Sequence, residues 1–384
     1  MRVLIDYRPA LRDRTGVGEF VHQLVSALAR ASNLSPSETD SIDITVFSSS
    51  WKDRLPDRMV TKLPSPVATI DCRIPVRLLN FSWHRVGWPP IESFTKRHFD
   101  VVHSPHPLLI PTRSAAQVVT IHDLDFLDHP EHTDAEVHRD YRNLTRLHAH
   151  RAAHIIVPSR YTAAQVERRL NIPREAISLC WNGAPDWQPR ARAPHDGHIL
   201  FVGTLTPRKN IGVLLEAYEL LVARQLAPPD LILAGTPGEQ ANAWLAAIER
   251  PPLANHVRCT GYLDPAALKE AYACARVLVL PSLDEGFGLP ALEAMTIGVP
   301  VVVANRGALP EVVGDAGLLV DPTDPVALAD AIERILGNPR LESLCVKRGF
   351  ERALAYSWDE SAKALIEAYR KAIESRTRET RTTE

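Results

Sequence analysis

Two glutamates bracket a short glycine-rich stretch toward the C-terminal end of the chain. Glu285 and Glu293 are separated by seven residues, and the apolar run before them predicts a buried strand. Gly286 and Gly288 allow the backbone to turn tightly and to approach a ligand, and Pro290 suits the first turn of a helix. A glycine loop at a helix N-terminus can bind an anion, while carboxylates beside it can hold hydroxyl groups. The alternative is an ordinary strand-to-helix turn with a solvated Glu285.

A pair of basic residues precedes another predicted helix. Arg208 and Lys209 follow the strand predicted over 198–203 and stand just before the helix predicted over 210–223. Positive charge at a helix N-terminus opposes the helix dipole unless an anion lies between them. We therefore expect this pair to neutralise a diphosphate, with two solvated surface charges as the alternative.

Further candidate residues follow two predicted strands in the first half of the chain. Gly16 and Gly18 lie between the first strand and its following helix, where backbone amides could approach phosphates, although a tight turn also explains them. His122 and Asp123 end another strand and would point into a cleft, with Asp125 as a further polar contact. A single histidine in such a place is more often structural.

Short apolar runs alternate with amphipathic segments along all 384 residues, which predicts an α/β protein with mostly parallel sheets. A chain of this length suits two domains. We predict two Rossmann-like domains that face each other across a cleft, with ligands beyond the carboxyl ends of the strands. The segment 50–98 indicates loops with short elements. The predicted parts are an N-terminal Rossmann-like domain at 1–185, a proline-rich linker at 186–197, a C-terminal Rossmann-like domain at 198–357, a C-terminal helix at 358–376 and a tail at 377–384.

Composition excludes several classes of protein. Apolar residues make up 45% of the chain and charged residues 23%, with a net charge of −2, which is typical of a soluble globular protein and indicates no nucleic acid. Five scattered cysteines without CxxC spacing argue against a disulfide framework. We find no signal peptide and no apolar run that could span a membrane, so the cytoplasm is the expected location. No metal motif stands out, since His103 and His106 lack a third ligand.

The stretch from Glu285 to Glu293 resembles the signature of retaining GT-B glycosyltransferases, in particular glycosyltransferase family 4. In that family the first glutamate contacts the donor sugar and the second binds the nucleotide ribose. The resemblance implies that the backbone of the intervening residues meets the diphosphate and the sugar. Those residues are Gly286, Phe287, Gly288 and Leu289. The pair Arg208-Lys209 is similar to the family's basic pair, which binds the departing nucleoside diphosphate.

The resemblance is looser over 1–185 than over 198–375. It implies that Gly16 and Gly18 form a loop for the donor phosphates, and that His122 lies beside the transferred sugar and the acceptor. A Ser-Trp pair similar to that at residues 357–358 opens a C-terminal helix in the family, and that helix returns to the N-terminal domain.

The resemblance implies a retaining enzyme that moves a hexose from a nucleoside diphosphate sugar, GDP- or UDP-linked, to a hydroxyl of a glycan or lipid-linked acceptor. It favours mannose as the transferred sugar and polysaccharide biosynthesis as the setting. It implies that the catalytic residues are Arg208, Lys209, Glu285 and His122, and that no metal or cofactor is required. The basic helix predicted over 134–153 would suit peripheral contact with an anionic membrane at the inner face of the cell membrane, or it is a solvated face. An epimerase of the same architecture and a catalytically silent sugar-nucleotide-binding module are the alternatives.

Overall fold

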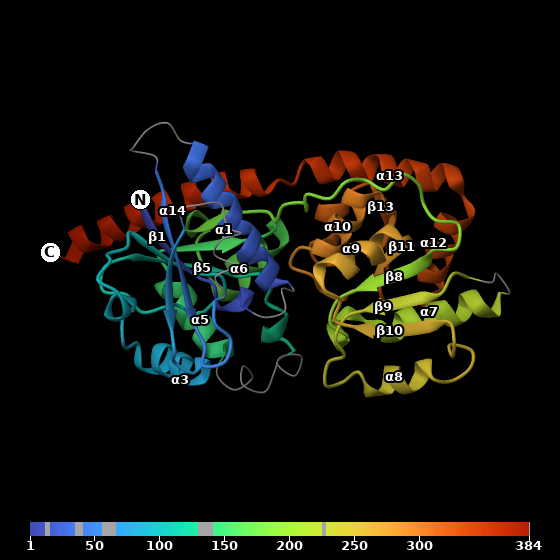
Figure 1. The fold of residues 1–384 in the computed structure, drawn as a ribbon, viewed down its shortest axis with the longest axis horizontal. Helices are drawn as coiled ribbons and strands as arrows, with labels where there is room; N and C mark the ends of the chain where they lie inside the picture. Colours follow the sequence, from blue (N-terminus) through green and yellow to red (C-terminus); the bar gives the residue numbers. More distant parts are fainter. Residues whose placement is uncertain (12–15, 35–40, 56–66, 130–140, 225–227, 384) are drawn as a thin grey trace. The chain divides into compact units, whose positions relative to one another are not determined.

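Figure 1 shows the computed structural model of the chain, which describes residues 1–11, 16–34, 41–55, 67–129, 141–224 and 228–383. The chain forms two compact units. Unit 1 contains Met1–Gly183 together with Ser357–Glu384, and unit 2 contains Ala184–Tyr356. Each unit is built on one parallel sheet with helices around it. The α/β class predicted from the alternating sequence pattern is therefore confirmed.

The sheet of unit 1 has seven parallel strands in the order β3-β2-β1-β4-β5-β6-β7. The strands are β1 (Arg2–Asp6), β2 (Asp43–Ser49), β3 (Val67–Cys72), β4 (Val101–Ser104), β5 (Ala116–Thr120), β6 (His154–Val157) and β7 (Ile177–Leu179). The helices are α1 (Val17–Leu34), α3 (Val76–Phe81), α5 (Tyr141–Arg151), α6 (Arg160–Leu170) and α14 (Trp358–Thr383). The strand order changes direction between β1 and β4, and sheets of this kind bind ligands at such a switch point.

The last helix of the chain belongs to the core of unit 1. Tyr369 of α14 is fully buried in one apolar cluster with Phe20 of α1, and Figure 1 shows these two helices side by side. The Tyr369 hydroxyl also lies 2.8 Å from Nδ1 of the buried His103 on β4. The helix continues to Thr383, beyond the residue at which we expected it to end.

The sheet of unit 2 has six parallel strands in the order β10-β9-β8-β11-β12-β13. The strands are β8 (His198–Val202), β9 (Leu231–Ala234), β10 (Val257–Gly261), β11 (Ala275–Leu280), β12 (Val301–Ala304) and β13 (Gly317–Val320). The helices are α7 (Ile211–Ala223), α8 (Asn242–Ile248), α9 (Pro265–Ala273), α10 (Leu289–Ile297), α11 (Leu309–Val313), α12 (Pro325–Gly337) and α13 (Pro339–Leu354). Its switch point lies between β8 and β11, which are the strands that precede the two predicted charged motifs.

The segment 50–98 contains several short elements. Besides β3 and α3 it holds the π-helix η3 (Ser82–Val86) and the 3-10 helix η4 (Ile91–Phe94). β3 is at the edge of the sheet and its residues are mostly half-buried, so its sequence lacks the apolar run that marks the central strands. In the helix predicted over 134–153, residues 134–140 lie outside the described residues, and α5 covers residues 141–151, so the helix ends two residues earlier than predicted.

Candidate functional site

The loops after β8 and β11 come together at the switch point of unit 2. The backbone N–H of Leu283 donates to the carbonyl oxygen of Arg208 over 2.8 Å, which joins the two loops directly. The side-chain amide of Asn210 then donates to the carbonyl oxygens of Pro281, over 3.1 Å, and Pro322, over 2.7 Å. These bonds hold the short helix η8 (Pro207–Lys209) against the glycine-rich loop. The two motifs, about seventy residues apart in the sequence, therefore form one site.

Glu285 is the centre of this site and is not a solvated residue. It is only 6% exposed. Its carboxylate accepts hydrogen bonds from the Lys209 ammonium, from the Ser282 hydroxyl over 2.8 Å and from Arg208 Nη1 over 3.3 Å. Burial alone would raise the pKa of Glu285, but the charges of Lys209 and Arg208 outweigh it and lower this pKa to about 2. The two cations and the carboxylate together carry one net positive charge, which suits an anionic ligand.

The glycine loop leads directly into the N-terminus of α10. Gly288 precedes the helix with a φ of +102°, and a Cβ at this position would lie 2.6 Å from the Leu309 side chain. Only glycine fits this combination of left-handed backbone and close packing. Gly288 is the N-cap residue of α10 and has no side chain that could cap the first turn. The positive end of the helix dipole therefore lies beside the glycine loop, where it can stabilise a phosphate.

Glu293 lies one turn into α10 and is oriented by a tyrosine that the sequence did not indicate. The hydroxyl of Tyr272 donates to Glu293 Oε2 over 2.6 Å. Tyr272 is fully buried on α9, and burial together with the charge of Glu293 raises its pKa well above 10. The phenol therefore remains a proton donor at neutral pH. No spacing rule links the two residues, because their contact depends on how α9 packs against α10.

In unit 1, the two predicted glycines lie at the start of α1. Gly16 has a φ of +46° and has open space around the position of a Cβ. At Gly18 a Cβ would lie 2.5 Å from the carbonyl oxygen of Pro9, because the helix starts against the short helix η1 (Arg8–Ala10). Local packing thus accounts for Gly18, and the role of both glycines in donor binding stays a prediction.

His122 lies two residues after the end of β5, and its ring is neutral. Its Nε2–H donates to the carbonyl oxygen of Pro105 over 3.1 Å, and its ring meets Phe20 edge-on with centroids 4.8 Å apart. Burial lowers the pKa of His122 to about 4. At neutral pH it can position a hydroxyl group but carries no positive charge. Asp123 is half-buried beside it, and Asp125 begins the 3-10 helix η5 (Asp125–Leu127).

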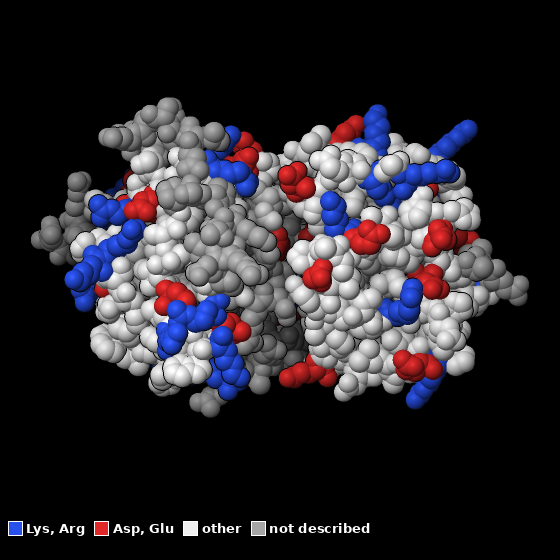
Figure 2. All heavy atoms as spheres, viewed as in Figure 1, with Lys and Arg blue, Asp and Glu red and all other residues white. Residues whose placement is uncertain are grey.

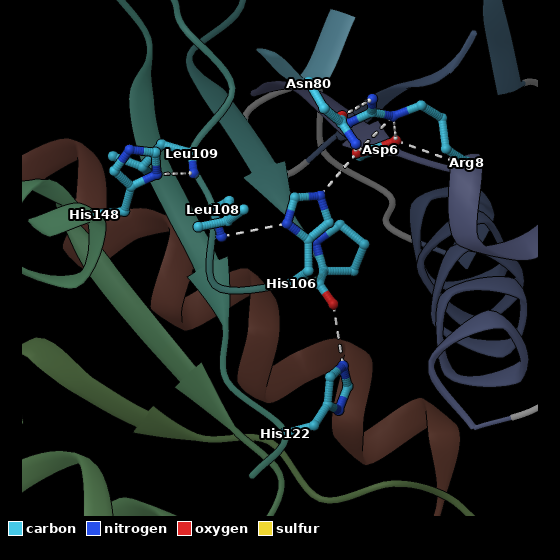
Figure 3. Close-up of polar contacts among 9 residues, drawn as sticks. Asp6, Arg8, Asn80, His106, Leu108, Leu109, His122 and His148 are labelled. Carbon is cyan, nitrogen blue, oxygen red and sulfur yellow. Dashed lines mark hydrogen bonds and ion pairs between the residues drawn. The ribbon is translucent and has the colours of Figure 1, made fainter. Parts of the chain in front are cut away.

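A second polar cluster lies at the switch point of unit 1, and sequence reasoning missed it (Figure 3). Asp6, the fully buried last residue of β1, accepts from Arg8 Nε over 2.9 Å and from Nη2 over 2.6 Å. Arg8 Nη1 also donates to Asn80 Oδ1 over 2.8 Å. His106 Nδ1 accepts from the backbone N–H of Leu108, so its Nε2–H donates to Asp6 over 3.2 Å. A strand-end aspartate followed two residues later by arginine was the signal available in the sequence.

The structure gives His103 a structural role. Its Nδ1 lies 2.8 Å from the hydroxyl of Tyr369 and its Nε2 lies 2.8 Å from the hydroxyl of Thr120. Within the described residues, no three or more His, Cys, Asp or Glu side chains are grouped as metal ligands. In the same part of the chain, no helix has both the length and the apolar character needed to cross a membrane.

Comparison with protein families and curated proteins gives consistent matches over most of the chain. A family model described as Glycosyltransferase Family 4 matches residues 14–186, and one described as Glycosyl transferases group 1 matches residues 196–338. O-antigen chain mannosyltransferase B of Escherichia coli is 30% identical over 393 residues, which cover 96% of this chain and 100% of that protein. D-inositol 3-phosphate glycosyltransferase of Corynebacterium urealyticum is 36% identical over 179 residues, which cover 45% of this chain and 42% of that protein.

Solved structures show the same fold. Sucrose-phosphate synthase from Thermosynechococcus elongatus has a TM-score of 0.77 at 22% identity and covers 98% of this chain and 100% of its own. WaaG, a glycosyltransferase involved in lipopolysaccharide biosynthesis, has a TM-score of 0.69 at 15% identity, covering 95% of this chain and 98% of its own. The GT-B architecture implied by the sequence resemblance is therefore confirmed.

Proposed function

The chain belongs to glycosyltransferase family 4, and from this premise we propose that it is a retaining hexosyltransferase that uses a nucleoside diphosphate sugar. The observation that carries the proposal is the buried cluster of Glu285 with Lys209 and Arg208 at the switch point of unit 2. A cluster with one net positive charge beside the N-terminus of α10 suits a diphosphate. We propose mannose from GDP-mannose as the donor, supported by the mannosyltransferase of Escherichia coli, with a UDP-linked sugar as the other candidate.

We assign the donor contacts residue by residue. Arg208, Lys209 and the backbone of residues 286–289 bind the diphosphate, and Glu285 contacts the sugar. Glu293, held by Tyr272, accepts hydrogen bonds from the ribose hydroxyls. In unit 1 we propose that Gly16 and Gly18 approach the donor phosphates.

We propose that the acceptor binds on unit 1, with neutral His122 positioning its hydroxyl. The acceptor oxygen attacks the anomeric carbon on the face from which the diphosphate leaves. The new C–O bond forms as the bond to the phosphate oxygen breaks, and that oxygen takes the hydroxyl proton. Arg208 and Lys209 stabilise the charge that develops on the departing diphosphate. Same-face attack retains the anomeric configuration without a carboxylate nucleophile.

We propose a glycan or lipid-linked sugar as the acceptor and polysaccharide biosynthesis as the setting. The reaction then takes place in the cytoplasm, in peripheral contact with the inner face of the cell membrane. The mechanism requires no metal or other cofactor, because the two cations and the helix N-terminus supply the stabilising charge.

The test is a two-stage assay on the full chain. A thermal-shift screen with UDP-, GDP-, ADP- and dTDP-linked sugars identifies the donor, and NMR then follows that donor with and without a glycan acceptor. We expect a glycoside with the anomeric configuration of the donor. An epimerised donor sugar without transfer would indicate an epimerase instead. Binding of the donor without hydrolysis or transfer would indicate a silent binding module, and an inverted product would refute retention.

A further inference from the structure

The loop that follows β4 in unit 1 is held by histidine side chains at two consecutive residues. His106 Nδ1 accepts the backbone N–H of Leu108 over 3.3 Å. On the other side, Nδ1 of His148 on α5 accepts the backbone N–H of Leu109 over 2.9 Å. Both bonds need an unprotonated Nδ1, and burial lowers the pKa of His148 to about 4, so its ring is neutral at neutral pH. The course of residues 105–109 is therefore fixed by side-chain contacts, although the segment belongs to no helix or strand.

The same loop is tied to the sheet through a buried charge. His106 Nε2–H donates over 3.2 Å to Asp6, which also pairs with Arg8. Charged side chains of both signs lie on the face drawn in Figure 2, whereas Asp6 is fully buried and the Arg8 side chain is 8% exposed. Burial would raise the pKa of Asp6, but the charge of Arg8 and the bond from His106 hold it well below its usual range. A buried ion pair adds little net stability, which favours a role in positioning its neighbours.

The loop also determines which ring nitrogen of His122 carries the proton. The carbonyl oxygen of Pro105, the residue before His106, lies 3.1 Å from His122 Nε2. A carbonyl oxygen can only accept, so the proton of the neutral ring is on Nε2 and Nδ1 keeps a lone pair. Figure 3 shows the series of contacts that leads from Asp6 through His106 to His122. With this tautomer, Nδ1 of His122 can accept a hydrogen bond from a hydroxyl group.

We propose that Asp6 and His106 are positioning residues, because together they hold the Pro105 carbonyl where it sets the tautomer and the orientation of His122. The proposal rests on the role that we propose for His122 in the transfer reaction. Its Nδ1 accepts a hydrogen bond from a hydroxyl group of the bound acceptor. A ring with the proton on Nδ1 would instead donate to the hydroxyl oxygen and would turn its proton away from the ring. Without the contact between Asp6 and His106, the Pro105 carbonyl would no longer select one tautomer.

Two substitutions at His106 separate its two contacts. His106→Gln keeps a side-chain N–H close to the position of Nε2, so it can still donate to Asp6. His106→Asn keeps an acceptor for the N–H of Leu108 close to the position of Nδ1, but it is too short to reach Asp6. We expect His106→Asn to lower kcat by on the order of tenfold with the KM for the nucleotide sugar nearly unchanged, because a misplaced His122 slows the reaction and leaves the donor contacts of unit 2 intact. His106→Gln should keep most of the wild-type kcat.

The tautomer itself can be measured without any substrate, by NMR of the full chain carrying nitrogen-15-labelled histidine. Long-range proton–nitrogen spectra distinguish a protonated Nε2 from a protonated Nδ1, and the variant His122→Gln assigns the ring signals of His122 by removing them. In the wild type at neutral pH we expect the proton on Nε2. In His106→Asn we expect His122 signals from both tautomers, because the Pro105 carbonyl is no longer held in place. A role of His106 in stability alone would leave the tautomer unchanged.

Double-variant kinetics show whether His106 acts through His122. If it does, adding His106→Asn to His122→Ala should lower kcat no further than His122→Ala does alone. His154→Asn is the matched control, because His154 is also a buried histidine with a side-chain partner, Ser178, whose hydroxyl lies 2.8 Å from its Nε2. His154 begins β6, whereas His122 follows the end of the neighbouring β5, so the two lie at opposite ends of parallel strands. The control should change neither kcat nor the tautomer of His122.

Three results would overturn the proposal. The first is a wild-type His122 with its proton on Nδ1. The second is a His106→Asn variant with the kcat and the His122 tautomer of the wild type, and the third is a double variant in which the two losses add. Failure of the proposed function looks different, because His122→Ala itself would then turn over at the wild-type rate. A slow His122→Ala beside a fully active His106→Asn would remove the positioning role alone.

Discussion

Replacing Lys209 with methionine would leave the buried carboxylate of Glu285 without its nearest positive charge. The Lys209 and Glu285 side chains are only 11% and 8% exposed. Removing one partner of a buried ion pair lowers the free energy of unfolding by about 3–5 kcal/mol. Arg208 Nη1 remains 3.3 Å from the carboxylate, so we expect the lower end of that range, about 3 kcal/mol.

The lowered pKa of Glu285 makes the stability of the folded chain depend on pH. Burial would raise this pKa, but the charges of Lys209 and Arg208 lower it from 4.5 to about 2. Each pKa unit corresponds to roughly 1.4 kcal/mol, so the surroundings of the ionised carboxylate stabilise the folded state by about 3 kcal/mol. Because the folded pKa is the lower one, this stabilisation is present above pH 4.5 and is lost as the pH falls toward 2.

Urea unfolding followed by circular dichroism measures the effect. If the loss comes from an unpaired buried charge, adding Glu285→Gln to Lys209→Met should restore most of it. Lys347→Met is the control, because Lys347 is 76% exposed in its pair with Glu351, and we expect a change within about 0.5 kcal/mol. A double variant no more stable than Lys209→Met would refute the pairing.

The same variants test the proposed function of the pair. Loss of one donor to the developing charge should lower kcat by on the order of a hundredfold, about 3 kcal/mol in the barrier. The double variant should recover stability but not turnover, because the cation is still missing and the proposed sugar contact of Glu285 is altered as well. Turnover of Lys209→Met at the wild-type rate would rule out the contact with the departing diphosphate.

Three further predictions follow from single contacts. Tyr272→Phe removes the hydroxyl that donates a hydrogen bond to Glu293, and such a bond to a charged group contributes about 1.5 kcal/mol. The KM for the nucleotide sugar should therefore rise about tenfold with kcat nearly unchanged. An equal loss in kcat by steady-state kinetics would contradict this. Gly288→Ala brings a Cβ to 2.6 Å from a leucine side chain, so thermal-shift measurements should show a lower Tm and a smaller shift with donor than Gly337→Ala, where a Cβ meets nothing within 4 Å. Burial lowers the pKa of His122 from 6.5 to about 4, so the free energy of unfolding should fall as the pH drops from 6.5 toward 4 and the unfolded chain takes up the proton first. An NMR titration midpoint of the ring near 6.5 would contradict this lowered pKa.

The central strands of both sheets could be predicted from sequence because they are buried on both faces. Runs such as residues 277–280 and 301–303 have to be continuously apolar when helices cover the two sides of a parallel sheet. The edge strand Val67–Cys72 is under no such requirement, and its mixed sequence Val-Ala-Thr-Ile-Asp-Cys carried no recognisable period. The length of the last helix was also underestimated, since its polar end continues to Thr383.

By itself, the sequence determined the α/β class, the glycine-rich turn and the residue types that a nucleotide-sugar site needs. These features depend on local backbone preferences and on the spacing of apolar residues, and both are set by residues that lie close together in the sequence. Only the tertiary structure decided that Glu285 is buried against Lys209 and Arg208, that Tyr272 orients Glu293, and that Asp6 holds Arg8 and His106. Such pairings join residues that follow different strands, and it is the order of the strands in the sheet that brings their carboxyl ends together.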